Sequence, residues 1–121
     1  MRRLAVLVSI LSTLAFAGPA AAAAVPPFPK LAGNWSHALI NVTIARKAHT
    51  LVLDRGRVVQ SSTSQLMIRE RDGNIVVVPL SQKTIVSLDG APSSIYSLGR
   101  GMTVQTMRID GGPAVRVRAS S

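Results

Sequence analysis

The residues of this sequence best suited to bind a ligand are arginines separated by one residue. Most of the arginines beyond residue 54 come in such pairs, as in Arg55 and Arg57. Residues two apart on a strand leave the same face of the sheet, so each pair presents two guanidinium groups together. Guanidinium groups bind carboxylate, phosphate and sulfate groups through forked hydrogen bonds. The candidate anion-binding residues are Arg57, Arg69, Arg71, Arg116 and Arg118.

The acidic residues show no arrangement suited to catalysis. Asp72, Asp89 and Asp110 each precede a glycine, where the aspartate caps its own turn and the glycine supplies left-handed backbone. Glu70, which lies between two arginines, and Asp54 are expected to be surface charge partners. No serine occupies a G-x-S-x-G turn. The sequence therefore predicts no catalytic residue and a protein that is not an enzyme.

Histidines supply the only metal-ligand candidates outside the carboxylates. His37 and His49 are expected on the two strands of one hairpin, where a histidine pair could bind a metal ion. A third ligand is not evident, so surface histidines are the preferred interpretation, and no metal or other cofactor is predicted. The chain has no cysteine, which excludes disulfides, thiolate metal sites and cysteine nucleophiles.

The first 24 residues are predicted to be a secretory signal peptide. Arg2 and Arg3 precede an uncharged run from Leu4 to Ala17, and alanines that fit a cleavage site follow Pro19. An uncleaved membrane anchor is the alternative, because about 20 apolar residues can span a bilayer. Pro19 and the weak hydrophobicity of the alanines argue against the anchor. We therefore expect a protein that is secreted or held in the periplasm or cell envelope, with no transmembrane helix after cleavage.

The chain is strongly basic and of a length that supports one domain. Its net charge is +9, and loss of the two leader arginines leaves +7, because all five acidic residues lie later. Such a chain attracts anionic polysaccharide, anionic lipid or acidic protein in a salt-dependent way. Nucleic acid is disfavoured, because proteins that bind single strands stack bases on aromatic rings. Beyond the signal peptide only Phe28, Trp35 and Tyr96 are aromatic.

Alternating β-branched residues predict an all-β fold. We expect a Pro-rich linker over residues 25–36 and an N-terminal β-hairpin over residues 37–53, which turns near Arg46. Residues 54–119 are predicted to form a small five- to six-stranded antiparallel barrel with one short helical turn at 92–98. Further strands are expected over residues 83–88, 102–109 and 114–118, the last with Val115 and Val117 on one face.

The segment from Leu66 to Val78 predicts a hairpin with a defined register. A three-residue loop over residues 71–73, with Gly73 left-handed, places Leu66 opposite Val78 and Ile68 opposite Val76. Those apolar side chains then share one face. The second strand is apolar on both faces, so its outer face needs cover from the N-terminal hairpin or from a second copy of the protein.

Turn glycines and alternating apolar residues recur at regular spacing over residues 54–118. The pattern comprises Gly56-Arg57-Val58, Leu66-Met67-Ile68, Asp72-Gly73, Val76-Val77-Val78, Thr84-Ile85-Val86, Gly90, and Leu98 followed by Gly101. It resembles an exported bacterial domain family of unknown function, although Ser61-Ser62 stands where a valine is expected. The resemblance implies a five- or six-stranded barrel similar to oligonucleotide- and oligosaccharide-binding barrels. It brings no assigned chemistry and no binding residues.

Two classes of function agree with these features. The first is a non-enzymatic binding module of the cell envelope, which holds an anionic polymer, an anionic surface or an acidic protein. The alternative is a structural or assembly module that uses an apolar sheet face or a sheet edge to associate with itself or another protein. High ionic strength discriminates between them, because it releases the first kind of partner and leaves the second bound.

Overall fold

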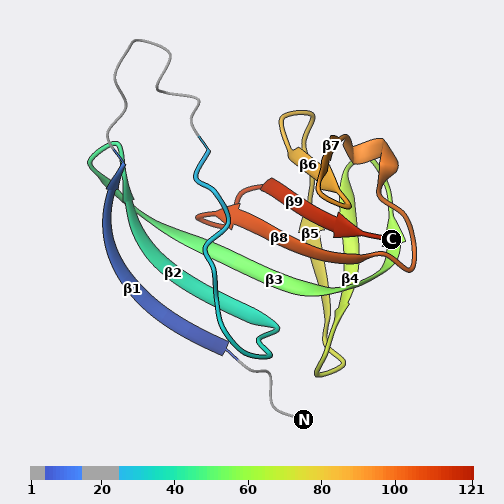
Figure 1. The fold of residues 1–121 in the computed structure, drawn as a ribbon, viewed down its shortest axis with the longest axis horizontal. Helices are drawn as coiled ribbons and strands as arrows, with labels where there is room; N and C mark the ends of the chain where they lie inside the picture. The colour runs from blue at the N-terminus through green and yellow to red at the C-terminus, as the bar shows by residue number, and fades with distance from the viewer. Residues whose placement is uncertain (1–4, 15–24) are drawn as a thin grey trace.

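One strongly curved sheet, built around the long strand β3, makes up the computed structural model, which describes residues 5–14 and 25–121 (Figure 1). The strands are β1 (Ala5–Leu14), β2 (His37–Ile44), β3 (Lys47–Ser61), β4 (Gln65–Glu70), β5 (Ile75–Pro79), β6 (Ile85–Leu88), β7 (Ala91–Ser93), β8 (Thr103–Ile109) and β9 (Ala114–Ser120). A 3₁₀ turn, η2 (Ile95–Ser97), lies between β7 and β8. The predicted all-β fold class is confirmed.

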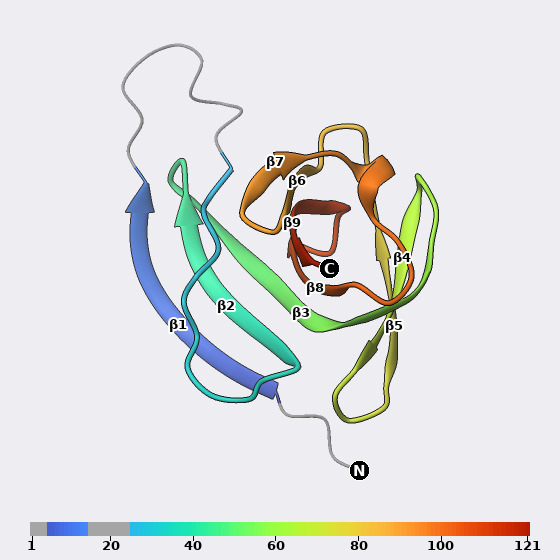
Figure 2. The same ribbon diagram turned by 45° about the vertical axis from the view of Figure 1, so that its right-hand side comes forward.

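Strand β3 organises the sheet because it is long enough to bend and to take three partners. Its first half pairs with β2, its second half pairs with β4, and β8 pairs along the opposite edge. A β-bulge between Val58 and Gln60 lets the strand turn sharply. The bend carries β4 and β5 around the ends of β8 and β9, which gives the curled half of the molecule that Figure 2 shows nearly end-on.

The curled half is not the closed antiparallel barrel that the sequence suggested. Among the strands of residues 5–14 and 25–121, β5 pairs only with β4, and the path β3-β8-β9-β6-β7 ends at β7, so no ladder of this described part joins the two ends. Strand β6 runs parallel to β9. The buried hydroxyl of Thr84 donates a hydrogen bond to the carbonyl oxygen of Ala114 at 2.7 Å, which ties the start of β6 to the start of β9. The expected barrel is therefore an open sheet of mixed direction.

The β4–β5 hairpin has the register expected from the sequence. Leu66 lies opposite Val78 and Ile68 opposite Val76, and the loop closes with the Glu70 amide donating to the Asn74 carbonyl at 2.8 Å. Gly73 has a φ of 91°. The three-residue loop is confirmed, because only that loop keeps the apolar side chains on the inner face.

The N-terminal hairpin is also confirmed, with a tighter turn than expected. Ile44 pairs with Lys47, so the loop is the dipeptide Ala45-Arg46. Its φ values are 50° and 66°, both in the left-handed region that a type I′ turn requires. Neither residue favours that backbone conformation.

Two apolar clusters fill the molecule, one on each face of β3. The inner cluster lies inside the curled half and includes Val58, Leu66, Ile68, Val78, Leu80, Val86, Ile95, Leu98, Val104, Ala114, Val117 and Ala119. The outer cluster lies on the opposite face and consists of Trp35, Ala38, Ile40, Leu51, Leu53 and Met107. Ile95 begins η2 and Leu98 directly follows it, and both are buried, so the short helical turn presents the apolar side expected of it.

The Pro-rich segment expected as a linker packs on the sheet as the cover of the outer cluster. Val25, Phe28 and Leu31 contact that cluster, and Trp35 is only 3% exposed. Arg116 on β9 fastens the segment, donating from Nε to the Pro26 carbonyl at 2.7 Å and from Nη2 to the Val25 carbonyl at 3.0 Å. In Figure 2 the segment crosses the face of β2 and β3.

A bulge in β9 separates two side chains expected on one face. Strand β9 shifts register against β8 between Met107 and Arg108. As a result, Val117 belongs to the inner cluster, whereas Val115 packs against the outer cluster. The expectation that Val115 and Val117 share a face is wrong, because an inserted residue reverses the alternation.

The predicted signal peptide falls partly on β1 and partly on residues outside the described ranges. Strand β1 pairs in parallel with the outer edge of β2, from Ala5 opposite His37 to Leu14 opposite Ile44. Within residues 5–14 and 25–121, no helix has the length and apolar character needed to cross a bilayer. Cleavage near residue 24 stays a prediction, and it would remove the strand that now borders β2.

Candidate anion-binding surface and a buried polar cluster

The register of the sheet brings some of the predicted arginines together. Arg57 on β3 lies directly opposite Arg69 on β4, and both side chains are exposed. Side chains of directly opposed residues leave the same face of the sheet about 5 Å apart at Cβ. Two guanidinium groups therefore stand side by side on the outside of the bend.

A second group, of two arginines with a glutamine between them, crosses three strands on the same face. Arg55 on β3 pairs with Gln105 on β8, and Gln105 pairs with Arg118 on β9. The Arg118 guanidinium donates from Nη2 to the Gln105 side-chain oxygen at 2.7 Å. We call the surface formed by Arg55, Arg57, Arg69, Gln105 and Arg118 the arginine face.

Arg55 and Arg118 are held in place by the N-terminal segment. Arg55 donates from Nε to the Trp35 carbonyl at 2.9 Å, and its Cζ lies 4.5 Å from the centre of the Trp35 ring. The Cζ of Arg118 lies 5.0 Å from the centre of the Phe28 ring. A guanidinium has five N–H donors, so both groups keep donors for a ligand while their positions are fixed.

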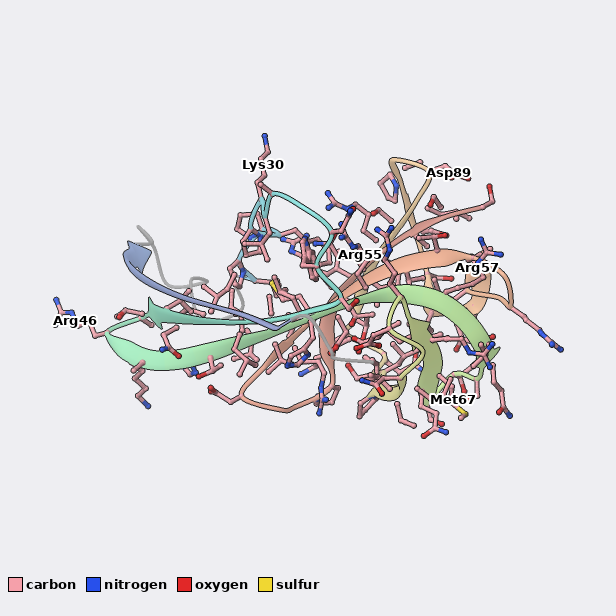
Figure 3. The ribbon with its side chains drawn as sticks, turned by 90° about the horizontal axis from the view of Figure 1, so that it is seen from below. Lys30, Arg46, Arg55, Arg57, Met67 and Asp89 are labelled. Carbon is pink, nitrogen blue, oxygen red and sulfur yellow. The ribbon has the colours of Figure 1, made fainter. Side chains whose placement is uncertain are left out.

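A shallow hollow of about 310 Å³ opens between these two arginines. Asp89 also lines it, and its carboxylate accepts hydrogen bonds from the Ser121 amide at 3.1 Å and the Ser121 hydroxyl at 2.8 Å. Those hydrogen bonds lower the pKa of Asp89 below its usual value, the hydroxyl contributing most. The hollow therefore combines two cations with one anion. Figure 3 shows Arg55 and Arg57 on the same side of β3 as Asp89.

The remaining predicted anion ligands take other places. Arg116 is committed to the carbonyls of the N-terminal segment, so it serves the packing of that segment. Arg71 is exposed in the β4–β5 loop, one residue beyond β4. The arginine face thus contains Arg57, Arg69 and Arg118 from the predicted set. It adds Arg55, whose spacing of two from Arg57 was the available signal.

The aromatic side chains of the described residues offer no platform for stacking bases on this face. Trp35 is buried, and the arginines lie over the rings of Trp35 and Phe28. Tyr96 is 69% exposed, but it lies on η2, away from the rows of paired arginines. The geometry gives nucleic acid no advantage over other polyanions.

Two carboxyl groups expected at the surface are instead buried. Asp54 is 1% exposed and Glu70 is 2% exposed. Asp54 lies opposite His37, and its Oδ1 is 2.8 Å from the His37 Nδ1. One ligand atom from each of the three side chains lies within 4.8 Å of the others. The surface assignment is wrong because both carboxyl groups stand on the inward-facing side of their strands. Glu70 follows Leu66 and Ile68 in the same alternation.

The two histidines do not meet. His37 pairs with Asp54, whereas His49 lies opposite Val42, one step out of phase, and so faces the other side of the sheet. His49 Nδ1 contacts Oδ2 of Asp110, and the Thr50 amide donates a hydrogen bond to Oδ1 of the same carboxylate at 2.8 Å. The Thr50 amide and, after it, His49 lower the pKa of Asp110.

The three Asp-Gly pairs stand in turns, as predicted, but the expected capping of its own turn is seen at Asp72, whereas the carboxylates of Asp89 and Asp110 bond to distant residues. Asp72 accepts a hydrogen bond from the Asn74 amide at 3.0 Å, in the pattern of an Asx turn. Asp89 and Asp110 have φ values of 51° and 54°, and each is followed by a left-handed glycine. Their positions are therefore set by the backbone geometry of the turns.

Comparison of the chain with protein-family models, curated proteins and solved structures finds no match. The resemblance to an exported domain family accordingly stays a prediction.

Proposed function

We propose that this protein is an exported, non-enzymatic binding module that holds an anionic polysaccharide on its arginine face. The observation that supports this most is the alignment of Arg55, Gln105 and Arg118 across β3, β8 and β9. Arg57 and Arg69 extend the same face around the bend. A row of cations that crosses several strands suits an extended polymer better than a compact ion.

The chemistry of the hollow favours a sugar polymer among polyanions. Two guanidinium groups can bind carboxylate or sulfate groups, and an ionised Asp89 can accept hydrogen bonds from hydroxyl groups. An anionic lipid surface or an acidic protein offers the negative charge, but a sugar offers hydroxyl groups beside every charge. The net positive charge of the chain also attracts a polyanion over long range, which favours its binding.

Titration of the purified protein with oligogalacturonate, followed by amide NMR, tests the proposal. Shifts are expected at Arg55, Arg57 and Arg118, and they should disappear at high salt. A neutral malto-oligosaccharide, an acidic peptide and anionic lipid vesicles are the comparison ligands.

Variants at two sites provide the matched comparison. Arg57→Gln should weaken glycan binding. Arg46→Asn removes the same charge at the hairpin tip, at the opposite end of the molecule from Arg57 (Figure 3), and should leave binding nearly unchanged. Equal loss in both variants would mean that net charge alone attracts the polymer. Stronger binding of the peptide or the vesicles than of the glycan would contradict the polysaccharide.

An assembly module is the second candidate, and a specific observation favours it. Ile75 and Val77 on β5 are 44% and 45% exposed, so the outer face of that strand has no cover from the N-terminal hairpin. Strand β5 also has an edge that pairs with no strand in the described part of the chain. Light scattering at low and high salt tests this candidate. A dimer that persists at high salt and is lost in Val77→Lys would support it.

A further inference from the structure

The cluster of His37, Asp54 and Glu70 lies apart from the arginine face, on the opposite side of β3. His37 begins β2, Asp54 lies within β3 and Glu70 ends β4, so each side chain comes from a different strand. All three are brought together where β3 passes from its pairing with β2 to its pairing with β4.

The backbone around Gly56 makes this approach possible. Gly56 follows Asp54 on the inward-facing side of β3 and lies directly opposite Glu70. A Cβ atom at Gly56 would lie 2.4 Å from the carbonyl oxygen of Arg69, so the position admits no side chain. Strands β3 and β4 therefore approach closely here, and the absence of a side chain at Gly56 lets the carboxyl group of Glu70 lie near that of Asp54.

The donor set is the one that divalent first-row metal ions take in proteins. An imidazole nitrogen and two carboxylate oxygens suit zinc and manganese, with bond lengths of about 2.0–2.2 Å to zinc. Such bonds hold neighbouring donors of a tetrahedral ion roughly 3.3 Å apart. The three ligand atoms lie within 4.8 Å of one another, so small side-chain rotations bring them to that spacing.

The burial of the carboxylates and the partial exposure of His37 are both compatible with a bound cation. Asp54 and Glu70 are 1% and 2% exposed, so their carboxylate oxygens lie in a buried site where a divalent ion can be held by both. The His37 side chain is 17% exposed, whereas Asp54 is 1% exposed, so an ion can enter past the histidine. Three protein ligands leave one position of a tetrahedral ion for water.

We propose that His37, Asp54 and Glu70 bind one divalent metal ion, zinc or manganese, which joins β2, β3 and β4 at the bend of the sheet. In a chain without cysteine, such an ion would supply a cross-link that disulfides cannot. The site does not depend on the arginine face, and its test is separate from glycan binding.

Calorimetric titration of the purified, chelator-treated protein with zinc chloride and manganese chloride tests the site. The expected result is one ion per chain and a higher midpoint of thermal unfolding in the presence of the metal. His37→Gln and Glu70→Gln should each weaken binding by at least about tenfold. His49→Gln is the matched control. His49 also contacts a carboxylate, that of Asp110, but no third ligand group joins that pair within the described residues.

A second measurement uses the unmodified protein, so its result does not depend on whether the variants fold. Manganese bound at the site should broaden amide NMR signals of residues 36–38, 53–57 and 69–71 before all others, because paramagnetic broadening falls steeply with distance. Absence of binding to the unmodified protein would overturn the proposal. So would broadening centred on His49 and Asp110, or binding that survives His37→Gln and is lost in His49→Gln.

Discussion

Arg57 and Arg69 lie directly opposite each other across β3 and β4, so two like charges occupy one cross-strand position. Directly opposed like charges destabilise a sheet, whereas opposite charges at such a position stabilise it. The two adjacent cations can together bind one anion, and this affinity would offset the cost of their repulsion. The pair therefore links the stability of the bend to the proposed binding function.

Replacing one of these arginines by glutamate should raise stability and lower affinity together. Arg57→Glu converts the like-charge pair into an opposite-charge pair, which is worth about 0.2–1 kcal/mol in the free energy of unfolding. The same change should weaken binding of oligogalacturonate. Urea unfolding and glycan titration measure the two effects. The double variant Arg57→Glu with Arg69→Glu restores repulsion and should lose the gain in stability. A single variant with unchanged stability would show that the two side chains do not interact.

The turn of the N-terminal hairpin should accept stabilising substitutions. Ala45 and Arg46 both have positive φ values, whereas Asn-Gly is the preferred dipeptide for this turn type. Ala45→Asn combined with Arg46→Gly should raise the free energy of unfolding by about 0.5–2 kcal/mol. Chemical denaturation measures the change. Unchanged or reduced stability would indicate a different turn in solution.

The close approach at Gly56 predicts a position that admits no side chain. Gly56→Ala would place a methyl group 2.4 Å from the Arg69 carbonyl oxygen, so β3 and β4 must separate. We expect a loss of about 1–3 kcal/mol in the free energy of unfolding. Gly99→Ala is the control, because a Cβ there has no atom within 4 Å. Similar losses in both variants would attribute the effect to glycine replacement in general.

Local parts of this fold follow from the sequence, and the nonlocal parts do not. The β4–β5 register is set by alternation and by the left-handed Gly73, both of which are visible within a few residues. The parallel pairing of β6 with β9 depends on Thr84 and Ala114, which are 30 residues apart. The burial of Asp54 beside Glu70 depends on the pairing of β4 with the second half of β3, so it could not be read from neighbouring charges.

The arginine face likewise has parts that the local sequence predicts and parts that it does not. Spacing by two correctly places Arg55 and Arg57 on one face of β3, because that rule is local. Whether a given arginine is available to a ligand depends on what packs beside it. Arg116 is taken by the carbonyls of Val25 and Pro26, which no local pattern indicates.

The carboxyl group of Asp110 should titrate below the usual aspartate pKa of about 3.9. The Thr50 amide is the main cause, and the His49 side chain is the second. A lowered pKa means that the interaction stabilises the fold above the unfolded pKa, and that this stabilisation is lost as the pH falls through the folded pKa. Carbon-detected NMR titration measures the value. His49→Ala should leave the pKa lowered, because the hydrogen bond from the Thr50 amide stays in place. Return of the pKa to its usual value in that variant would show that His49, not the amide, is the main cause.

The hydrogen bonds of Arg116 to the N-terminal segment can be tested by a substitution that keeps the positive charge. Arg116→Lys removes the forked donation to the Pro26 and Val25 carbonyls, because a lysine ammonium cannot match that geometry. The segment should then loosen from the outer cluster and admit water to Trp35, which is 3% exposed in the intact fold. We expect a shift of the tryptophan fluorescence to longer wavelength and faster proteolysis between Pro29 and Trp35. Arg69→Lys is the control, because Arg69 lies on β4 in the curled half, remote from this segment in sequence and in the sheet. If the segment were only a linker, both variants would behave like the unmodified protein, and Trp35 would already emit as a solvated indole.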